Sequence, residues 1–374
     1  MTKQQVCTRC VMDTTDPEIV FDEKGVCNHC HNYDKGIKTQ VFSGKIGEQK
    51  LTALVKDIKA SVPASQKYNC LIGVSGGVDS SYVAYLCKEY GLSPLAFHLD
   101  NEWNDPISVK NIEIIVERLG IDLVTKKIDW DEYRDLQLAF LYASIPDCEV
   151  PTDYALNTTF HELADKYNIK YIINGCNIRT ESHLPRTWSQ GHFDWKYIDS
   201  INKRYGHTNL TSYTPTTPVG LYMDSVRHKV VSVLNYIDYN KTTAMKVLES
   251  RLGWEYYGGK HYESIYTRFY QGYILPKKFG FDKRKMHYSS LICSGEMKRE
   301  VALQELQKEP YPLELQYSDL DTVCKKFGLS SKEFERIMNQ PVKKFSDYKS
   351  YTNSPARNIA RMMRDTIIRP LLSH

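Results

Sequence analysis

Short apolar runs alternate with amphipathic segments over much of the chain, and this alternation predicts its fold. Buried strands are expected at residues 68–74, 94–100, 121–128 and 171–176. Helices are expected at residues 50–60, in the twelve or so residues before Gly91, at residues 106–119, and after residue 153. Strands that alternate with helices in this way predict an α/β fold with a doubly wound parallel sheet.

Changes in composition along the chain predict three regions. Residues 1–45 are rich in cysteine and turn residues and show little periodicity, so we expect a small module without a core of its own. Residues 46–235 carry the α/β pattern, and residues 236–374 are expected to be mostly helical, as is the chain from about Tyr222. Residues 177–217 are expected to form a long irregular segment, of a kind that is often functional.

The composition of the 374-residue chain, with 41% hydrophobic and 25% charged residues, is typical of a soluble globular protein. A net charge of +4 gives no strong field for holding nucleic acid or anionic lipid, so neither partner is expected. The N-terminus lacks the apolar core of a signal peptide, and no apolar run approaches the roughly 18 residues of a membrane helix. We therefore expect a cytoplasmic protein without membrane insertion.

The hexapeptide SGGVDS, residues 75–80, joins a predicted strand to a predicted helix. Glycines at such a turn let the backbone approach an anion, and the free N–H groups of the helix N-terminus favour phosphate. Ser75 and Ser80 add hydroxyl donors. The Asp79 carboxylate would repel phosphates unless a cation lay between them, which suggests Mg²⁺. The alternative is a tight turn in which Asp79 merely caps the helix.

This loop resembles the pyrophosphate-binding loop of the N-type ATP pyrophosphatases, which include asparagine, GMP and NAD synthetases and the tRNA thiolases. Members cleave ATP between the α and β phosphates to adenylate an oxygen. In an open parallel sheet the carboxyl ends of the strands surround the ligand. The resemblance implies that ATP is bound by Ser75, Gly76, Gly77, Asp79 and Ser80, with His98, Asp100 and Asn101 near adenine and ribose and Gly175 near the α-phosphate. For Asp100 and Asn101 an ordinary polar loop is the alternative.

Four of the ten cysteines form two Cys-x2-Cys pairs, Cys7 with Cys10 and Cys27 with Cys30. This spacing is typical of a Zn²⁺ ion held by four thiolates, which would supply folding energy that the short segment lacks. Four thiolates leave no open position on zinc, so a structural or docking role is expected, and an iron–sulfur cluster is the alternative. The remaining cysteines are expected to be small buried residues: Cys70, Cys87, Cys148, Cys176, Cys293 and Cys324.

Residues 253–300 interleave aromatic side chains with Lys, Arg and His, which suits stacking on a base and holding phosphates. The segment LPKKFGFDKRKM resembles a basic segment near ATP in asparagine-synthetase-like domains. The resemblance implies catalytic roles toward pyrophosphate for Lys277, Lys278 and Arg284, with Asp282 beside them. Weaker candidates are Lys260, His261, Glu263 and Arg268. A helical subdomain with a solvated charged face is the alternative.

Three stretches together, CTRCVMDTTDPEIVFDEKGVCNHC, SGGVDSSYVAYL and residues 253–296, resemble the N-acetyl sugar amidotransferases of surface-polysaccharide biosynthesis. The resemblance implies an enzyme of LPS O-antigen or surface-glycan synthesis that uses ATP and Mg²⁺. It would convert the acetamido group of a nucleotide-linked amino sugar to an acetamidino group. Ammonia would come from partner glutaminase and cyclase-like subunits.

The expected mechanism begins with attack of the acetamido oxygen on the α-phosphate, which releases pyrophosphate and forms an adenylylated imidate. Ammonia then replaces AMP. No general base is assigned from the sequence, and Glu181, Glu263 and His261 are the candidates. One rival is a tRNA thiolase, which would need Cys148 and Cys176 near the site. The other is a zinc-dependent scaffold that is not an enzyme and whose loop is vestigial.

Overall fold

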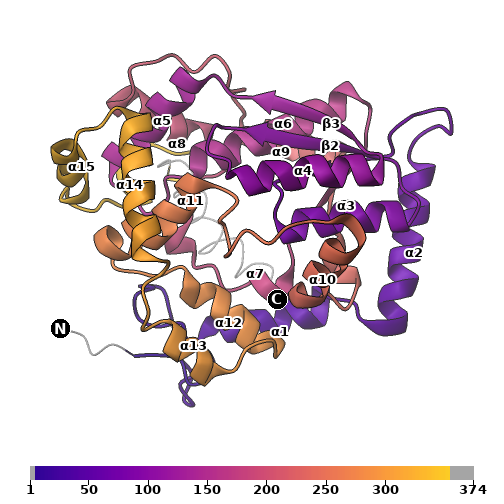
Figure 1. Ribbon diagram of the computed structural model, residues 1–374, viewed down its shortest axis with the longest axis horizontal. Helices are drawn as coiled ribbons and strands as arrows, with labels where there is room; N and C mark the ends of the chain where they lie inside the picture. The colour runs from indigo at the N-terminus through magenta and orange to yellow at the C-terminus, as the bar shows by residue number, and fades with distance from the viewer. Residues whose placement is uncertain (1–4, 354–374) are drawn as a thin grey trace, which may run out of the picture.

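The structure is a computed structural model that describes residues 5–353, and its centre is a five-stranded sheet (Figure 1). Neighbouring strands run parallel in the order β3-β2-β1-β4-β5. The strands are β1 (Cys70–Gly73), β2 (Pro94–Asp100), β3 (Asp122–Lys127), β4 (Tyr171–Asn174) and β5 (Lys229–Ser232). The prediction of a doubly wound parallel sheet is confirmed.

Helices cover both faces of the sheet, as a sheet built from parallel strands requires. Successive strand residues alternate between two hydrophobic cores, since Cys70 and Ile72 belong to one core and Leu71 belongs to the other. The first core includes α2 (Gly44–Ala60), α3 (Val78–Glu89), α4 (Pro106–Leu119) and α10 (Lys241–Leu252). The second includes α5 (Trp130–Ala143), α6 (Val150–Lys166), α8 (Trp195–Tyr205), α11 (Ile265–Phe269), the π-helix η3 (Tyr270–Phe279), α14 (Leu313–Phe327) and α15 (Ser331–Met338).

The strand order reverses between β1 and β4, because the chain builds outward from β1 through β2 to β3 and then returns to the other side of β1. Such a reversal leaves a crevice at the carboxyl ends of the two central strands, where ligands bind in open α/β sheets. The loop after β1 and the loop after β4 are therefore brought together by topology alone.

The cysteine-rich N-terminal segment lies against helices from distant parts of the chain. Its helix α1 (Asn28–Gln40) packs on α7 (Ile178–Glu181) and on α12 (Arg284–Ser294), and α7 and α12 also contact each other. Figure 1 shows α1, α12 and α13 (Arg299–Glu305) at the lower edge of the molecule. The N-terminal segment thus shares its packing with the two regions that follow it in sequence.

The segment 177–217, expected to be irregular, contains the eleven-residue helix α8. Asp194 caps this helix by accepting a hydrogen bond from the backbone N–H of Tyr197, and Tyr197, Ile198 and Ile201 are buried along one side. A capping residue followed by apolar residues at helical spacing is a pattern from which this helix could have been predicted. The expectation of a wholly irregular segment is therefore wrong.

A second correction concerns β5, which lies in the stretch expected to be mostly helical from about Tyr222. Its four residues pair in parallel with β4 at the edge of the sheet, and none of them is fully buried. A short, half-exposed edge strand gives neither an apolar run nor a clear alternation, so the pattern did not indicate it. The other short elements are α9 (Pro218–Arg227), η1 (Arg186–Trp188), η2 (Val233–Tyr236) and η4 (Phe345–Asp347).

Among residues 5–353, no helix combines the length and apolar character that a membrane span requires. The end of the third predicted region, residues 354–374, lies outside the described residues.

Candidate active site

The crevice at the strand reversal is built around residues 74–77, called the glycine loop below, which link β1 to α3. Gly76 has a φ of 76°, a left-handed conformation that side chains disfavour. A Cβ atom at this position would lie 2.2 Å from the backbone oxygen of Ser108 in α4. Only glycine fits, because the loop backbone presses directly on the neighbouring helix.

Two serine hydroxyls hold the glycine loop in shape. The Ser80 Oγ atom accepts from the Ser75 amide at 3.2 Å and donates to the Gly77 carbonyl at 3.1 Å. The Ser75 Oγ atom accepts from the Gly77 amide at 3.3 Å. These long bonds surround the N-terminus of α3, where backbone N–H groups favour an anion. The predicted phosphate-binding residues are thus brought together.

The glycine loop is also supported by the segment GWEYY, which lies about 180 residues farther along the chain. The indole N–H of Trp254 donates to the Gly76 carbonyl at 2.9 Å, and the hydroxyl of Tyr257 accepts from the Val78 amide at 3.3 Å. The sequence indicated this segment only as a candidate for ligand binding. Its role in fixing the loop could not be read from local pattern, since it depends on packing between distant segments.

Asp79 lies in the first turn of α3, between the two central strands. A Cβ atom on Gly175, which follows β4, would lie 3.1 Å from the Asp79 Cβ atom, so Gly175 permits this close approach. The Tyr239 hydroxyl donates a hydrogen bond to Asp79 Oδ1. Burial raises the pKa of Asp79 against the opposing charge of Lys241. Burial destabilises the charged form of this carboxylate, and a bound cation would stabilise that form.

A cavity of about 580 Å³ opens from the glycine loop across the carboxyl end of β2. It is lined by Ser75, Ser80, His98, Asn101 and Gly175 among others, so the structure gathers these predicted residues at one cavity. Asp100 is not among its lining residues, because its Oδ1 atom accepts hydrogen bonds from the Glu102 amide and the Asn104 side chain in the adjoining turn. We call this space the nucleotide cavity.

His98 is held as a neutral ring at the wall of the nucleotide cavity. Its Nδ1–H donates to the Val74 carbonyl at 3.0 Å, which leaves Nε2 to accept from Asn104 at 3.2 Å. Burial lowers the pKa of His98, in keeping with a neutral imidazole. The ring therefore ties β2 to the glycine loop and presents an uncharged edge to the cavity.

Glu263 places a second carboxylate beside the glycine loop. A Cβ atom on Gly77 would lie 3.8 Å from the Glu263 carboxyl carbon. Burial alone would raise the pKa of Glu263, but His261, whose Nδ1 lies 3.5 Å from Oε1, holds it below its ordinary value. The Oε2 atom is buried and has no hydrogen-bond partner among residues 5–353. A charged carboxylate with an orphaned oxygen beside a phosphate loop fits a divalent cation.

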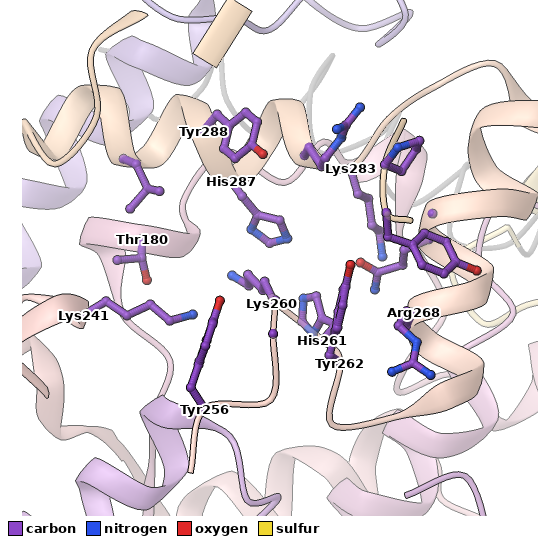
Figure 2. Close-up of a pocket in the computed structure, with 18 of the residues that line it drawn as sticks. Thr180, Lys241, Tyr256, Lys260, His261, Tyr262, Arg268, Lys283, His287 and Tyr288 are labelled. Carbon is purple, nitrogen blue, oxygen red and sulfur yellow. The ribbon is translucent and has the colours of Figure 1, made fainter. Parts of the chain in front are cut away.

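A second cavity, of about 540 Å³, adjoins the nucleotide cavity and is rich in basic and aromatic side chains (Figure 2). We call it the basic cavity. The two cavities share His261, Gln271, Lys283 and His287 as lining residues. The aromatic residues of the basic cavity are Tyr256, Tyr262, Tyr288 and Tyr311.

Three lysines supply positive charge to the basic cavity. Lys260 pairs with Glu181 at 3.1 Å, and Lys283 lies 3.8 Å from Glu149. Lys241 makes no hydrogen bond or ion pair with any residue in the described range. Figure 2 shows the side chains of Lys241 and Lys260 pointing toward the space below His287. The charge of Lys241 is therefore available to an anionic ligand, whereas that of Lys260 is shared with Glu181.

Most of the cations predicted from the sequence are engaged elsewhere. Lys278 donates to the Ile337 carbonyl and the Lys277 ammonium lies 3.8 Å from the Tyr273 ring centre, and neither lines the two cavities. Arg284 lines the basic cavity, but its guanidinium is bound to Asp282 and to backbone carbonyls at the end of α13. Arg268 likewise forms a two-pronged ion pair with Asp319 at 2.8 Å.

The four predicted metal ligands meet at one point and are fully buried. Their sulfur atoms lie 3.9 Å apart for Cys7 and Cys30, 3.6 Å for Cys10 and Cys27, and 3.8 Å for Cys27 and Cys30. Thiolates about 2.3 Å from one tetrahedral zinc ion would be about 3.8 Å apart. An iron–sulfur cluster binds its cysteine thiolates through several iron atoms, so the sulfur atoms of those cysteines lie farther apart. The geometry fits a single ion such as Zn²⁺.

The cysteine site is joined directly to the helices of the basic cavity. Arg299 of α13 donates to the Cys7 carbonyl at 2.8 Å and to the Cys10 carbonyl at 2.9 Å. Ser289 of α12 accepts from the Val11 amide at 3.2 Å. Because Lys283 directly precedes α12 and His287 lies within it, the cysteine site helps to position one wall of the two cavities.

The other six cysteines divide into two groups. Cys70, Cys87 and Cys148 are buried as expected, whereas Cys176 is exposed and Cys293 and Cys324 are partly exposed. Burial raises the pKa of the Cys148 thiol to about 12, so it stays protonated at neutral pH. The thiolate pair that a thiolase would need is not formed by Cys148.

Two family models match the chain in separate regions. The model described as NAD synthase matches residues 50–138, which include the glycine loop. The model described as LPS biosynthesis protein WbpG-like, C-terminal domain, matches residues 263–363, which begin at Glu263 and include α12. The two matched regions thus meet at the nucleotide cavity, where Glu263 lies beside the glycine loop.

Individual proteins show more limited similarity. A tRNA(Ile)-lysidine synthase from Chlamydia pneumoniae is 33% identical over 96 residues, which are 23% of this chain and only 30% of that protein's length. An NH3-dependent NAD synthetase from Campylobacter jejuni, solved with a nitrate ion, superposes with a TM-score of 0.30 and 14% identity over 75% of this chain and 96% of its own. An NMN synthetase from Francisella tularensis superposes with a TM-score of 0.28 and 17% identity, over 57% of this chain and 97% of its own.

The glycine loop with its aspartate, the parallel sheet and the two regional matches agree with one another. Together they are consistent with an N-type ATP pyrophosphatase whose residues 50–138 are similar to NAD synthase and whose residues 263–363 are similar to the WbpG-like C-terminal domain.

Proposed function

We propose that the protein is an ATP-dependent amidotransferase that converts the acetamido group of a nucleotide-linked amino sugar to an acetamidino group. The observation that carries this proposal is the joining of two cavities. One is walled by the glycine loop, and the other offers lysines and tyrosines to a second anionic, ring-containing ligand. An enzyme that only hydrolysed ATP would have no use for the second cavity.

ATP would lie in the nucleotide cavity with its phosphates at the glycine loop. The acetamido oxygen attacks the α-phosphorus, the bond to the β-phosphate oxygen breaks, and pyrophosphate leaves with the electron pair. Lys241 and Lys260 would meet that charge from the adjoining basic cavity, which both side chains line. They take the role that the sequence assigned to Lys277 and Lys278. Preorganised charges of this kind stabilise a transition state without reorganisation.

We assign Mg²⁺ to the carboxylates near the loop, of which Glu263 has a buried oxygen without a hydrogen-bond partner among residues 5–353. Asp79 and Glu263 would hold it, and its charge would screen the phosphates from both side chains. Zn²⁺ fits the four cysteines and would serve the fold rather than the chemistry, since four thiolates complete its coordination.

The sugar nucleotide would occupy the basic cavity. Tyrosine rings can stack on a base or a sugar face, and Lys283 can meet a diphosphate. We place the reaction in LPS O-antigen or surface-glycan synthesis, in line with the name of the WbpG-like family model. Ammonia would be delivered by glutaminase and cyclase-like partner subunits.

The first half of the reaction gives a direct test. Purified protein with Mg²⁺, ATP and labelled pyrophosphate should return label to ATP only when an acetamido sugar nucleotide is present, because exchange requires reversible adenylation. UDP-N-acetylglucosamine and other UDP-linked acetamido sugars are suitable probes. An Asp79→Asn variant should lose the exchange. Sugar-independent exchange, or wild-type exchange in Asp79→Asn, would contradict the proposal.

A further inference from the structure

His287 lies on α12 with both ring nitrogens buried and without a hydrogen-bond partner among residues 5–353. An imidazole has one donor and one acceptor when neutral, and leaving both unpaired in a protein interior is costly. Such a side chain is retained where a ligand completes its bonds.

The position of His287 points to the reacting atoms. It lines both the nucleotide cavity and the basic cavity. Figure 2 shows its ring projecting from the helix toward the middle of the space, above Lys260 and beside His261. The ring centres of His261 and His287 are 5.4 Å apart. His261 is already engaged by Glu263, so His287 is the histidine of this pair that has free nitrogens.

The surroundings keep His287 uncharged. Burial lowers its pKa well below the ordinary value, and the positive charges of Lys260, His261, Lys283 and Lys241 lower it further. Each carboxylate that lines the two cavities has another partner: Glu181 pairs with Lys260, Glu263 with His261, Glu149 with Lys283, Asp282 with Arg284 and Asp153 with His192, and Glu296 accepts a hydrogen bond from Asn240. The ring is therefore able to accept a proton at neutral pH. Bound phosphates would offset the lysine charges and raise its basicity.

We infer that His287 accepts the proton that the attacking nitrogen loses when it displaces AMP. This inference rests on the proposed function and supplies the general base that the sequence left unassigned. None of the earlier candidates has the same properties, because Glu181, Glu263 and His261 are each held by a neighbouring charge.

The step balances without a further reagent. The lone pair of ammonia forms the new C–N bond at the adenylylated imidate carbon. One N–H proton of the resulting ammonium passes to the free acceptor nitrogen of His287. The bond from carbon to the phosphate oxygen then breaks, and AMP leaves with its electron pair. Because the acetamido nitrogen keeps its own hydrogen throughout, loss of AMP gives the amidinium product directly, and His287 passes its proton to water.

The test separates the two half-reactions in a His287→Asn variant. The variant should retain pyrophosphate–ATP exchange with a UDP-linked acetamido sugar within about threefold of wild type. It should lose about 100-fold or more of ammonia-dependent AMP release, the usual effect of a general base. Hydroxylamine should restore AMP release in this variant. Its protonated form gives up a proton more readily than ammonium does, so its attack needs no general base. A His161→Asn variant, altered in a separate cavity, is the control.

Equal loss of both half-reactions in His287→Asn, or no loss in either, would overturn the inference. A wild-type protein without exchange on any sugar would instead overturn the proposed function. In that case the protonation of His287 can be measured by itself, by NMR of the histidine rings over a range of pH. The signal of His287 is the one that is missing from the His287→Asn variant. The signal of the ligand-free protein should titrate well below the range of an ordinary histidine, whereas a midpoint near the usual value of about 6.5 would overturn the inference.

Discussion

Replacing Gly76 by alanine tests the structural basis of the ATP site most sharply. The left-handed conformation at this residue costs a non-glycine side chain about 1–2 kcal/mol. The added Cβ would also lie 2.2 Å from the Ser108 oxygen and 2.8 Å from its Cα atom. Because such contacts are essentially never found below 3.0 Å, the loop and α4 must separate by close to 1 Å.

The expected consequence is a loss of ligand binding that exceeds the loss of stability. A displacement of about 1 Å at a catalytic group costs about 100-fold in rate, so AMP formation should fall by about that factor and MgATP affinity by at least about tenfold. Isothermal titration calorimetry with MgATP measures the affinity, and urea unfolding measures the stability.

Gly120→Ala is the matched control. Gly120 also has a left-handed φ, of 58°, but nothing lies within 4 Å of the position of a Cβ atom. This variant should lose about 1–2 kcal/mol of stability from backbone strain and bind MgATP normally. If Gly76→Ala binds MgATP as tightly as the Gly120→Ala control, the assignment of the loop as the phosphate site is refuted.

Three further variants test the charges around the site. Glu263→Gln should raise the Mg²⁺ concentration needed for half-maximal ATP binding about tenfold, and an unchanged Mg²⁺ dependence would count against a metal at this carboxylate. Lys241→Ala should weaken binding of inorganic pyrophosphate about tenfold in calorimetry, whereas Lys246→Ala, exposed on the same helix, should not, and equal affinities would remove Lys241 from the site. Burial opposes the charge on His192, but Asp147 and Asp153 outweigh it and raise the pKa of His192 to about 10, against about 6.5 in the unfolded chain. The native state therefore binds more protons between these values, so this stabilisation is complete below about pH 6.5 and is lost toward pH 10. The stability deficit of His192→Gln in urea unfolding should shrink over that interval, and a constant deficit would show that the charge does not matter.

Local sequence patterns were sufficient to predict the residues at the centre of the candidate site. A buried strand, two glycines and an amphipathic helix define β1, the glycine loop and α3 from adjacent residues. Parallel topology then accounts for His98, Asn101 and Gly175, because the ends of neighbouring strands meet at the same edge. The four cysteines were identified by spacing alone, since each pair turns its two thiols toward the same point.

The rest of the site depends on how distant segments pack. Trp254 and Glu263 lie beside the glycine loop although they are far from it in sequence. No local pattern distinguishes them from the other residues of their aromatic, charged segment. The same holds for His287, whose role depends on both cavities. Lys277 and Lys278 show the converse, because basic residues in a promising segment were directed by the π-helix toward Tyr273 and Ile337.

The cysteine site is packed against the helices that line the basic cavity. Arg299 binds the carbonyls of two cysteine-site residues, and α1 packs on the helix that carries His287. A metal ion that fixes Cys7 and Cys10 therefore also fixes the position of α12. Metal binding at the cysteines would therefore stabilise one wall of the two cavities.

The measurement that tests the central claim most directly is mass spectrometry of the sugar product. Purified protein would be incubated with ATP, Mg²⁺, ammonium and a panel of UDP-linked acetamido sugars, with Asp79→Asn as the control. The account predicts AMP, pyrophosphate and a sugar nucleotide with the small mass decrease of NH replacing oxygen, all absent in the control. No AMP with any sugar, but AMP formation with tRNA and a sulfur donor, would contradict it.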